Sequence, residues 1–306
     1  LRVFSNPIRI VAGPMVRQFE KAVGRIFGKK YGIMVNSGSS ANLIAFEILN
    51  LPRGSEVITP ALTFSTTLAP ILQKGLVPVF VDVEPGTYVV NHRSIESLIT
   101  KRTRALMIPS LIGNLPDWQR LQATAKKHRL WLIEDSCDTL GSRFKGKPTG
   151  YYSHISTTSF YASHIITAAG GGGMVMVNDP RLAKRARLIA YWGRESTLFG
   201  AYEKSEELKK RFAGTLDGDR YDAKFIFSEV GYNFQPTEAQ AAFGLVQLKR
   251  LKKFAAVRQA NFESLMHFFK KYEDVFILPR MVPGVRTNWL AFPLTIRDDA
   301  PFSRQE

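Results

Sequence analysis

Cysteine is nearly absent from this chain, since Cys137 is the only one in 306 residues. A single thiol cannot form an intrachain disulfide, complete a four-cysteine zinc site or ligate an all-cysteine iron–sulfur cluster. The five histidines are scattered without the spacing of metal ligands, so we expect no metal site. Cys137 follows a strand-like run, and we interpret it as a small buried residue at the end of that strand.

Long hydrophobic runs are also missing. No apolar stretch reaches the roughly 18 residues that a membrane-spanning helix needs, and the first ten residues, LRVFSNPIRI, lack the order of a signal peptide. Apolar residues still make up 45% of the chain, which is enough for a full core at this length. We therefore expect a folded cytoplasmic protein with no membrane partner.

Acidic residues are few beside the basic ones, 26 against 42, which leaves a net charge of +16. Such a charge raises nucleic acid as a partner. The basic residues, however, form short dispersed clusters, with no aromatic-interleaved stripe and no nucleic-acid-binding motif. We expect no nucleic-acid partner and interpret the charge as a solvated basic surface that also attracts a nucleotide diphosphate.

Strand-like and helical runs alternate along the first half of the chain. Helices are expected at 14–27, 41–51, 66–73, 94–98 and 117–128, and strands at 33–35, 57–58, 77–81, 105–108 and 130–133. The alternation predicts an α/β fold with a parallel sheet covered by helices on both faces. Ligands of such sheets bind at the carboxyl ends of the strands. One site there would gather residues that follow strand-like runs: Asn36, Phe64, Asp135 and His164.

Three features near these strand ends each have two interpretations. The Gly/Ser turn at residues 36–40 opens a helix and suits a phosphate group, but Ser and Gly are also ordinary helix caps. The pair Glu134-Asp135 either caps the next turn or supplies a functional anion. The four glycines after His164 suit a tight bend with close backbone approach better than a phosphate cradle.

The second half of the chain has a different pattern. A helix is expected at 180–192, then a charged segment at 193–230 that is too long for a structureless loop and favours a functional or interface role. Helices follow at 237–251 and 255–272, the first capped by Thr237, and a strand at 288–296. We expect a large domain at 1–250 and, at 251–306, the start of a smaller domain that is incomplete at the end of this sequence.

Six motifs in order resemble the DegT/StrS family of sugar-modifying enzymes: NSGSSAN, TPALTFSTT, PVFVDVEPGTYVVN, IEDSCDTLGS, SFYASH and GYNFQPTEAQAAFGLVQL. The resemblance runs from about residue 10 to the end. It implies pyridoxal 5′-phosphate or its amine form, pyridoxamine 5′-phosphate, on the type I aminotransferase fold. That fold has a mostly parallel seven-stranded sheet between helices and a small C-terminal α/β domain.

The resemblance also implies roles for single residues. Phosphate contacts fall on Gly38, Ser39, Ser40 and Ser159, and on Asn233 reaching in from a neighbouring subunit, so a homodimer is implied. Phe64 matches the aromatic residue that stacks on the cofactor ring. Asp135 matches the carboxylate that pairs with the ring nitrogen, where it keeps the ring protonated and able to accept electrons. Asp138 stands where the family usually has Gln or His near the cofactor's phenolic oxygen.

His164 is the main departure from the family pattern, because most members have a Schiff-base lysine there. No lysine occurs between Lys147 and Lys184. Imidazole cannot form a stable Schiff base, but it can act as a general base. The substitution resembles the 3-dehydratases of 4-keto-6-deoxy nucleotide sugars, and so implies loss of the C3 hydroxyl with His164 as base. A lone histidine is otherwise more often structural.

Further details refine this hypothesis. The tract at 195–200 lacks the cysteines of the dehydratase branch that carries an iron–sulfur cluster, so no cluster is expected and an amino donor such as L-glutamate would regenerate the amine cofactor. Arg194 and Lys224 either bind substrate phosphates or form exposed ion pairs. Two departures remain: Gly170 replaces a usual Glu, and Ile165 replaces a frequent second histidine. The alternatives are a nucleotide-sugar aminotransferase and a catalytically inactive binding or sensor protein of the same fold.

Overall fold

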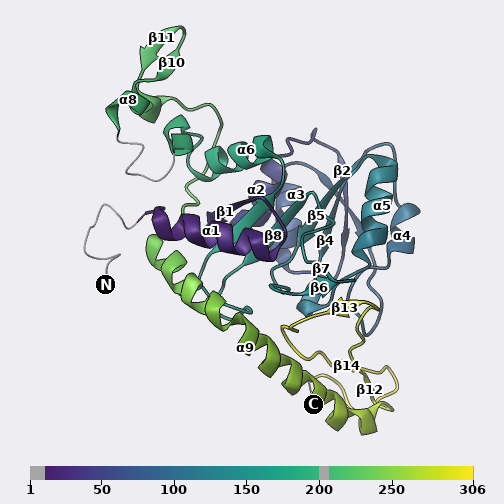
Figure 1. Ribbon diagram of the computed structural model, residues 1–306. Helices are drawn as coiled ribbons and strands as arrows, with labels where there is room; N and C mark the ends of the chain where they lie inside the picture. Colours follow the sequence, from purple (N-terminus) through teal and green to yellow (C-terminus); the bar gives the residue numbers. More distant parts are fainter. Residues whose placement is uncertain (1–10, 200–206, 306) are drawn as a thin grey trace.

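A seven-stranded sheet forms the centre of the computed structural model, which describes residues 11–199 and 207–305 (Figure 1). Its strands are β1 (Tyr31–Val35), β2 (Glu56–Pro60), β3 (Val77–Val81), β4 (Thr103–Pro109), β5 (Trp131–Asp135), β8 (Ile155–Ser159) and β9 (Gly173–Val177). The spatial order is β1-β9-β8-β5-β4-β2-β3. β9 pairs antiparallel with both of its neighbours, and the other pairings are parallel. The predicted mostly parallel seven-stranded sheet is confirmed.

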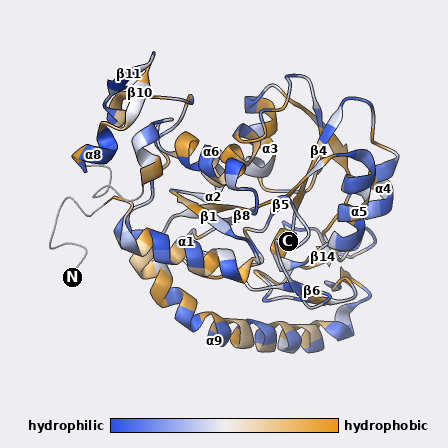
Figure 2. Ribbon diagram, turned by 45° about the horizontal axis from the view of Figure 1, so that its top comes forward, coloured by the Kyte–Doolittle hydropathy of each residue, from blue (hydrophilic) through white to orange (hydrophobic). Residues whose placement is uncertain are grey.

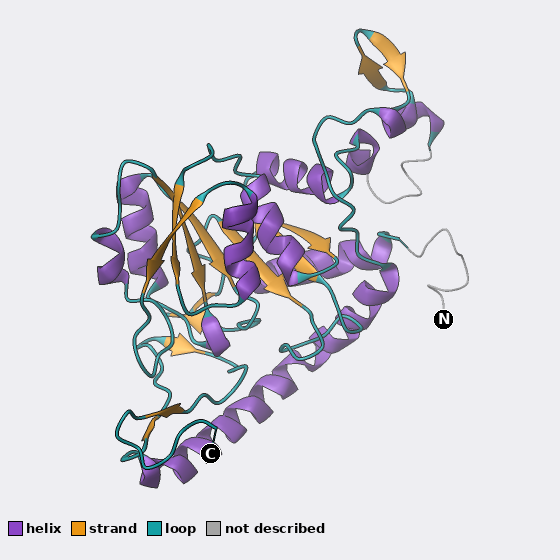
Figure 3. Ribbon diagram, turned by 180° about the vertical axis from the view of Figure 1, so that it is seen from behind, coloured by secondary structure: helices purple, strands orange, loops and turns teal. Residues whose placement is uncertain are grey.

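Helices cover both faces of the sheet (Figure 3). On one face α2 (Gly38–Glu47), α3 (Ser65–Gln73) and α6 (Pro180–Ala190) enclose one core cluster. On the other face lie α1 (Pro14–Ile26), α4 (His92–Glu96), α5 (Trp118–His128) and α9 (Glu238–Phe269). This is the predicted arrangement of a sheet between helices.

Alternate residues of each strand enter different cores. In β1, Ile33 and Val35 pack under α2 and α6, while Met34 faces α1 and α9. Because side chains of a strand point to opposite faces in turn, both faces of these short strands must be apolar. Figure 2 shows the apolar strands enclosed by helices, with hydrophilic residues outermost most clearly on α4 and α5.

Helix α9 differs from the prediction of two helices. Residues 238–269 form one continuous helix of 32 residues, followed by the short 3-10 helix η5 (Lys270–Tyr272). The residues between the two predicted helices, Lys252 to Phe254, include no glycine or proline and so give the helix no reason to stop. The predicted cap is confirmed, because Thr237 and Gln240 form a reciprocal capping box.

The predicted strand at 288–296 is wrong over most of its length. Only β14 (Thr295–Ile296) is a strand, and it pairs with β12 (Phe276–Ile277). Trp289 has a positive φ of 35°, which a strand does not permit. Its ring stacks on Phe262 of α9 with centroids 4.2 Å apart, and Arg258 donates hydrogen bonds to the Trp289 and Leu290 carbonyls. Packing against α9 therefore sets the backbone here.

The segment at 193–230 has structure of its own. The described parts are η3 (Glu195–Phe199), α8 (Leu208–Arg211), the hairpin β10 (Gly214–Leu216) and β11 (Asp219–Tyr221), and η4 (Ala223–Phe225). Figure 1 shows α8 and the hairpin projecting away from the sheet. Helix α6 before this segment ends at Ala190, two residues earlier than predicted, because Trp192 has a left-handed φ of 62°.

Other predictions are not tested by the fold. The boundary proposed at residue 250 lies inside α9, and a separate domain at 251–306 stays a prediction. Part of that region pairs with earlier residues, because β13 (Val285–Arg286) pairs with β6 (Arg143–Phe144) and β6 with β7 (Lys147–Pro148). The prediction for the first ten residues lies outside the described residues. Across 11–199 and 207–305, no helix is long and apolar enough to span a membrane.

Helices α1 and α9 are joined through one buried carboxylate. Glu238, in the first turn of α9, accepts hydrogen bonds from the backbone N–H groups of Gly13, Met15 and Val16 at 2.6, 2.9 and 2.9 Å. These groups belong to the N-terminus of α1, where a helix has unpaired N–H donors and favours negative charge. Glu238 thus caps the other helix as well as lying at the start of its own.

Replacing Glu238 by Gln should lower the free energy of unfolding by about 2 kcal/mol, the range of hydrogen bonds to charged groups. The amide of Gln keeps one oxygen as an acceptor, but its NH2 group would face backbone N–H donors and leave at least one of them without an acceptor. Urea unfolding followed by circular dichroism measures the change. Glu263→Gln, on the exposed part of α9, is the matched control and should change stability by less than about 0.5 kcal/mol. Equal effects of the two variants would contradict the capping role.

Candidate active site

The Gly/Ser turn and the end of β8 meet at one edge of the sheet. Ser37 is the N-cap of α2, and its Oγ accepts the N–H of Ser40 at 3.0 Å. Gly38 lies so close to β8 that a Cβ there would be 2.6 Å from the Cβ of Ser159. Ser39 is exposed, and its hydroxyl donates to Thr66 at the start of α3. The structure therefore brings Gly38, Ser39, Ser40 and Ser159 together, as predicted.

The carboxylate of Asp135, at the end of β5, is buried in a hydrogen-bond network. Its Oδ2 accepts from Asn42 Nδ2 at 2.9 Å and from Thr67 Oγ1 at 2.7 Å, and its Oδ1 accepts from the N–H of Cys137 at 3.2 Å. Thr157 of β8 donates to Asn42 Oδ1 at 2.6 Å, which turns the Asn42 amide group toward Asp135. Donors from α2, α3 and the turn after β5 thus hold both oxygens of this carboxylate, and β8 acts on it through Asn42.

Glu134 and Asp135 point to opposite faces of β5. Glu134 accepts hydrogen bonds from Ser136, Thr149 and the N–H of Gly150, and complete burial raises the pKa of its carboxyl. It therefore braces the following turn, while Asp135 faces the helices α2 and α3. The bracing role applies to Glu134, and the functional role of Asp135 stays a prediction.

Cys137 is partly buried two residues after β5, and burial raises the pKa of its thiol. A Cβ at Gly38 would lie 3.2 Å from its sulfur. Cys137 lies just after a strand, as predicted, but it is only partly buried, and its sulfur lies next to the Gly/Ser turn.

Phe64 is the N-cap residue of α3 and its ring is 68% exposed. The next residues fix its place, because Thr66 contacts Ser39 and Thr67 contacts Asp135. An aromatic ring is therefore presented at the surface beside the Asp135 network. Stacking on a cofactor stays a prediction.

His164 lies in the turn between β8 and β9 and is fixed on both sides. Ile165 and Ile166 after it are buried in the core under α1 and α9. The His164 N–H donates to the Tyr161 carbonyl at 3.1 Å, and the two rings meet edge to face with centroids 6.4 Å apart. The imidazole is 18% exposed, so one part of the ring reaches solvent.

Asp138 contacts His164. Its Oδ1 is 3.4 Å from Nδ1 of the imidazole, and its Oδ2 accepts the N–H of Ile112 at 2.9 Å. Ile112 belongs to the 3-10 turn η2 (Leu111–Gly113) after β4. The structure places Asp138 against the histidine, in the turn that follows Asp135, and its predicted position near the cofactor's phenolic oxygen stays a prediction.

The glycine run makes a close backbone approach, as predicted. A Cβ at Gly173 would lie 2.2 Å from the Ser37 carbonyl oxygen, so only glycine fits where β9 begins. The Gly172 N–H donates to the Asn36 carbonyl at 2.9 Å. These glycines therefore allow the start of β9 to pack directly against the Gly/Ser turn.

Asn233 is exposed and stands apart from the Asp135 network. Its backbone bridges to Tyr191, and its Oδ1 accepts from Gln235 at 3.3 Å. The next residue, Phe234, accepts the N–H of Asn36 at 2.9 Å, which ties this segment to the Gly/Ser turn. A contact from Asn233 to a partner subunit's cofactor stays a prediction.

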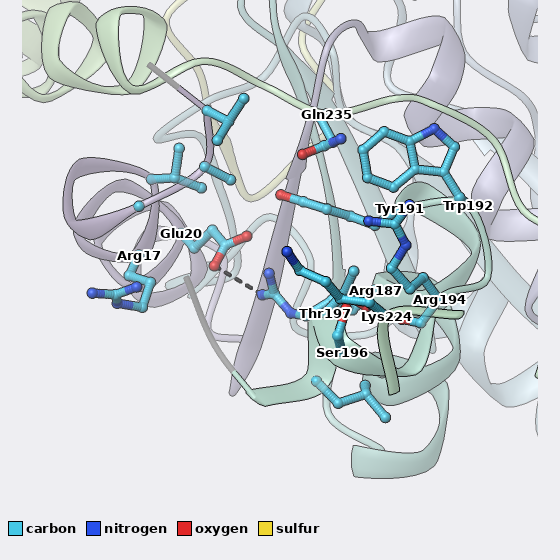
Figure 4. A pocket seen from close by; sticks show the side chains of 15 residues that line it. Arg17, Glu20, Arg187, Tyr191, Trp192, Arg194, Ser196, Thr197, Lys224 and Gln235 are labelled. Carbon is cyan, nitrogen blue, oxygen red and sulfur yellow. Dashed lines mark hydrogen bonds and ion pairs between the residues drawn. The ribbon is translucent and has the colours of Figure 1, made fainter. Parts of the chain in front are cut away.

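Arg194 and Lys224 line a separate cavity of about 330 Å³ between α1, α6 and η3 (Figure 4). The Arg194 guanidinium lies over the Trp192 ring at 4.7 Å and near Phe227 at 5.7 Å. Figure 4 shows Arg187, Arg194 and Lys224 on one side of the cavity and Arg17 on the other. Its lining includes neither Asp135 nor His164. The two predicted cations are thus brought together, but away from the His164 contacts.

The sequence analysis did not identify Asn42, Thr67 and Thr157, which belong to the Asp135 network. It also did not identify Ile112, which binds Asp138. Asn42 and Thr67 lie inside motifs that were singled out, so their positions after the Gly/Ser turn and after Phe64 are a usable signal. Thr157 and Ile112 give no such signal. No group of three side chains suited to a metal ion occurs among residues 11–199 and 207–305.

Known proteins match most of the chain. It is 40% identical to the dTDP-4-dehydro-2,6-dideoxy-D-glucose 3-dehydratase of Saccharopolyspora spinosa, over 97% of this chain and 66% of that protein. It is 33% identical to the GDP-perosamine synthase of Caulobacter vibrioides, over 81% of this chain and 60% of that protein. The chain thus spans about two thirds or less of the length of these two relatives.

A solved structure has the same fold. The E. coli GDP-4-keto-6-deoxy-D-mannose-3-dehydratase with bound hydrated PLP superposes with a TM-score of 0.84 and 29% identity, over 97% of this chain and 72% of that one. The sheet order, the edge that collects the predicted residues and these likenesses agree with the resemblance seen in the sequence motifs. The model of the DegT/DnrJ/EryC1/StrS aminotransferase family matches residues 4–306, and the chain belongs to that family.

Proposed function

We propose that this protein is a 3-dehydratase of nucleotide-linked 4-keto-6-deoxyhexoses that uses pyridoxal phosphate in its amine form. One observation carries the proposal: His164, and no lysine, stands in the turn between β8 and β9, held by Asp138 beside the Asp135 turn. A chain without a lysine there cannot bond covalently to the cofactor at that place, but it retains a group that accepts and returns protons.

The residues at the sheet edge fit a pyridoxal cofactor. Gly38 leaves the space between α2 and Ser159 that a Cβ would fill, and the first turn of α2 offers N–H donors and a positive dipole end to a phosphate. Asp135 is a buried carboxylate already oriented by three donors. When bound, the cofactor supplies an amine and an electron-accepting ring.

Each residue then has a defined task. Gly38, Ser39, Ser40 and Ser159 bind the phosphate. Asp135 would keep a proton on the ring nitrogen, and Phe64 would stack on the ring. His164 would take up a proton as general base while the C3 hydroxyl of the sugar is lost as water. Deoxygenation at C3 is a two-electron reduction, and L-glutamate or a similar amino donor would supply the electrons: it would be converted to its 2-oxo acid and restore the amine form, and ammonia would be released.

The cavity at Arg194 suits the diphosphate of the nucleotide sugar. Arg17, Arg194 and Lys224 line it, and the carboxylate on its wall, Glu20, is paired with Arg187 at 2.9 Å. Guanidinium groups bind phosphate oxygens in a fixed fork geometry. His164 does not line this cavity. We therefore propose that the active site forms between the two subunits of a homodimer, where the cavity of one subunit lies next to the cofactor site of its partner.

Exposed apolar residues between 208 and 230 support the dimer. Large apolar side chains of α8, of η4 and of the residues just after η4 are open to solvent: Leu208 at 67%, Phe225 at 63%, Phe227 at 54% and Val230 at 93%. Isolated apolar side chains are common on surfaces, but a group of this kind on a projecting element is typical of an interface. The predicted reach of Asn233 into the neighbouring subunit fits the same assembly.

The dehydratase is tested with the purified chain, pyridoxamine phosphate, L-glutamate and a panel of 4-keto-6-deoxy nucleotide sugars, with products identified by mass spectrometry. A 3-deoxy product is expected, and His164→Asn should lower kcat at least about 100-fold, the usual contribution of a general base. An amino-sugar product would instead support the aminotransferase suggested by the perosamine synthase relative. Substrate binding without turnover by the unmodified protein would support the sensor alternative.

Arg194→Gln should raise the KM for the nucleotide sugar about tenfold with little change in kcat, since one charged hydrogen bond of about 1.4 kcal/mol is lost in both ground and transition states. Initial rates over a range of substrate concentrations give both constants. Arg181→Gln, at an exposed position on α6, is the control. A fall in kcat with KM unchanged would contradict the binding role.

The dimer is tested by mixing two inactive variants. Asn233→Ala loses a phosphate contact in trans and His164→Asn loses the base, so a mixed dimer keeps one intact site of its two. Equal mixing makes half of the dimers mixed, and about a quarter of the unmodified activity should return. Activity that stays at the level of the separate variants, although size-exclusion chromatography shows mixed dimers, would place Asn233 outside the partner's site.

A further inference from the structure

We propose that Asp138 is a positioning residue for His164, which fixes the imidazole proton on Nδ1 and leaves Nε2 as the atom that takes up protons. The inference rests on the proposed role of His164 as the base. It replaces the contact with the cofactor's phenolic oxygen that the family resemblance implies for Asp138.

The contact between the two side chains carries the inference. Oδ1 of Asp138 is 3.4 Å from Nδ1 of His164, and the side chains are 16% and 18% exposed. Nδ1 is buried and has no hydrogen bond of good geometry within the described parts of the chain. A carboxylate accepts hydrogen bonds and cannot donate them, so the neutral imidazole lowers its energy by turning an N–H toward Asp138. Nε2 is then the nitrogen without a proton.

The other oxygen of Asp138 is held by the backbone. The N–H of Ile112 donates to Oδ2 at 2.9 Å. Ile112 has φ 60° and ψ 8°, a left-handed conformation that is unfavourable for a β-branched residue and persists only where its surroundings impose it. This conformation aims the Ile112 N–H at the carboxylate. Both oxygens of Asp138 are therefore directed, one to the backbone and one to the imidazole.

Residues from the C-terminal segment impose that conformation. The Leu290 N–H donates to the Ile112 carbonyl at 2.9 Å, and the Thr287 hydroxyl donates to the Gly113 carbonyl. A Cβ at Gly113 would lie 2.8 Å from the Trp289 Cα, so this turn and residues 287–290 are in direct backbone contact. The turn, Asp138 and His164 form a continuous set of contacts that starts in the last third of the chain.

A role at the cofactor's phenolic oxygen fits Asp138 less well. That oxygen carries partial negative charge, and a carboxylate beside it would be repelled unless protonated. Gln or His, which the family usually has there, can donate a hydrogen bond, whereas an ionised Asp cannot. Orienting a base through its other ring nitrogen is a role that a carboxylate performs well.

The Asp138→Asn variant gives a sharp test, because only one orientation of the new amide satisfies both neighbours. Its oxygen must accept from Ile112, so its NH2 group faces Nδ1 of His164 and requires an acceptor there. The neutral ring should therefore change from the Nδ1–H to the Nε2–H form. Long-range 15N–1H spectra of protein with 15N-labelled histidine, recorded without cofactor, report the two forms, and His164→Asn identifies the signal.

The expected result is a predominantly Nδ1–H ring in the unmodified protein and a predominantly Nε2–H ring in Asp138→Asn, with kcat of dehydration about 100-fold lower and KM unchanged. Asp117→Asn, which retains a cap at the start of α5, is the matched control and should change neither. An unchanged His164 ring form in a folded Asp138→Asn variant overturns the inference. If the ring form changes but His164→Asn still dehydrates, the positioning stands and the base role of His164 falls.

Discussion

The burial of one carboxylate constrains the whole site. Asp135 is 6% exposed, and a buried charge is tolerated only when its oxygens are hydrogen-bonded. Asn42 from α2, Thr67 from α3 and the N–H of Cys137 after β5 provide those bonds. Thr157 of β8 fixes the Asn42 amide in the orientation that donates. The need to satisfy Asp135 therefore sets the spacing of two helices and two strands, and with it the gap between the Gly/Ser turn and the rest of the edge.

Local patterns were sufficient for the layers of the fold, and long-range packing decided where they failed. The strands at 33–35, 105–108 and 130–133 are apolar on both faces, which only a sheet between helices explains. Such a pattern carries no information on direction, so it could not reveal that β9 runs antiparallel. Trp289 belongs to an apolar run that resembles a strand, and its stacking on Phe262 overrides that preference. Local periodicity of the sequence does not reveal tertiary contacts between distant residues.

Some residues of the candidate site could likewise be predicted from the sequence, and others could not. Asn36, Phe64, Asp135 and His164 could be predicted to lie at one edge because the carboxyl ends of parallel strands share it, whereas Gly38 and Ser159 were implied only by the family resemblance. The partner of Asp138 could not be predicted, since the contact depends on the φ of Ile112 and, through it, on hydrogen bonds from Leu290 and Thr287. Arg194 and Lys224 line one cavity, which could not be predicted because it also depends on α1, far away in the sequence.

The pairing of Asp138 with His164 also bears on which reaction the site can perform. A lysine that bonds to a cofactor must lose its proton, and a carboxylate 3 to 4 Å away favours the charged ammonium and opposes that step. An imidazole in the same place suits the carboxylate, which can accept the N–H of the neutral ring. The proposed role of residue 164 in proton transfer, in place of covalent attachment, agrees with this environment. The orientation of the His164 ring is constrained on several sides: by Asp138, by the turn at Ile112 that binds Asp138, and by the buried residues Ile165 and Ile166 that follow it.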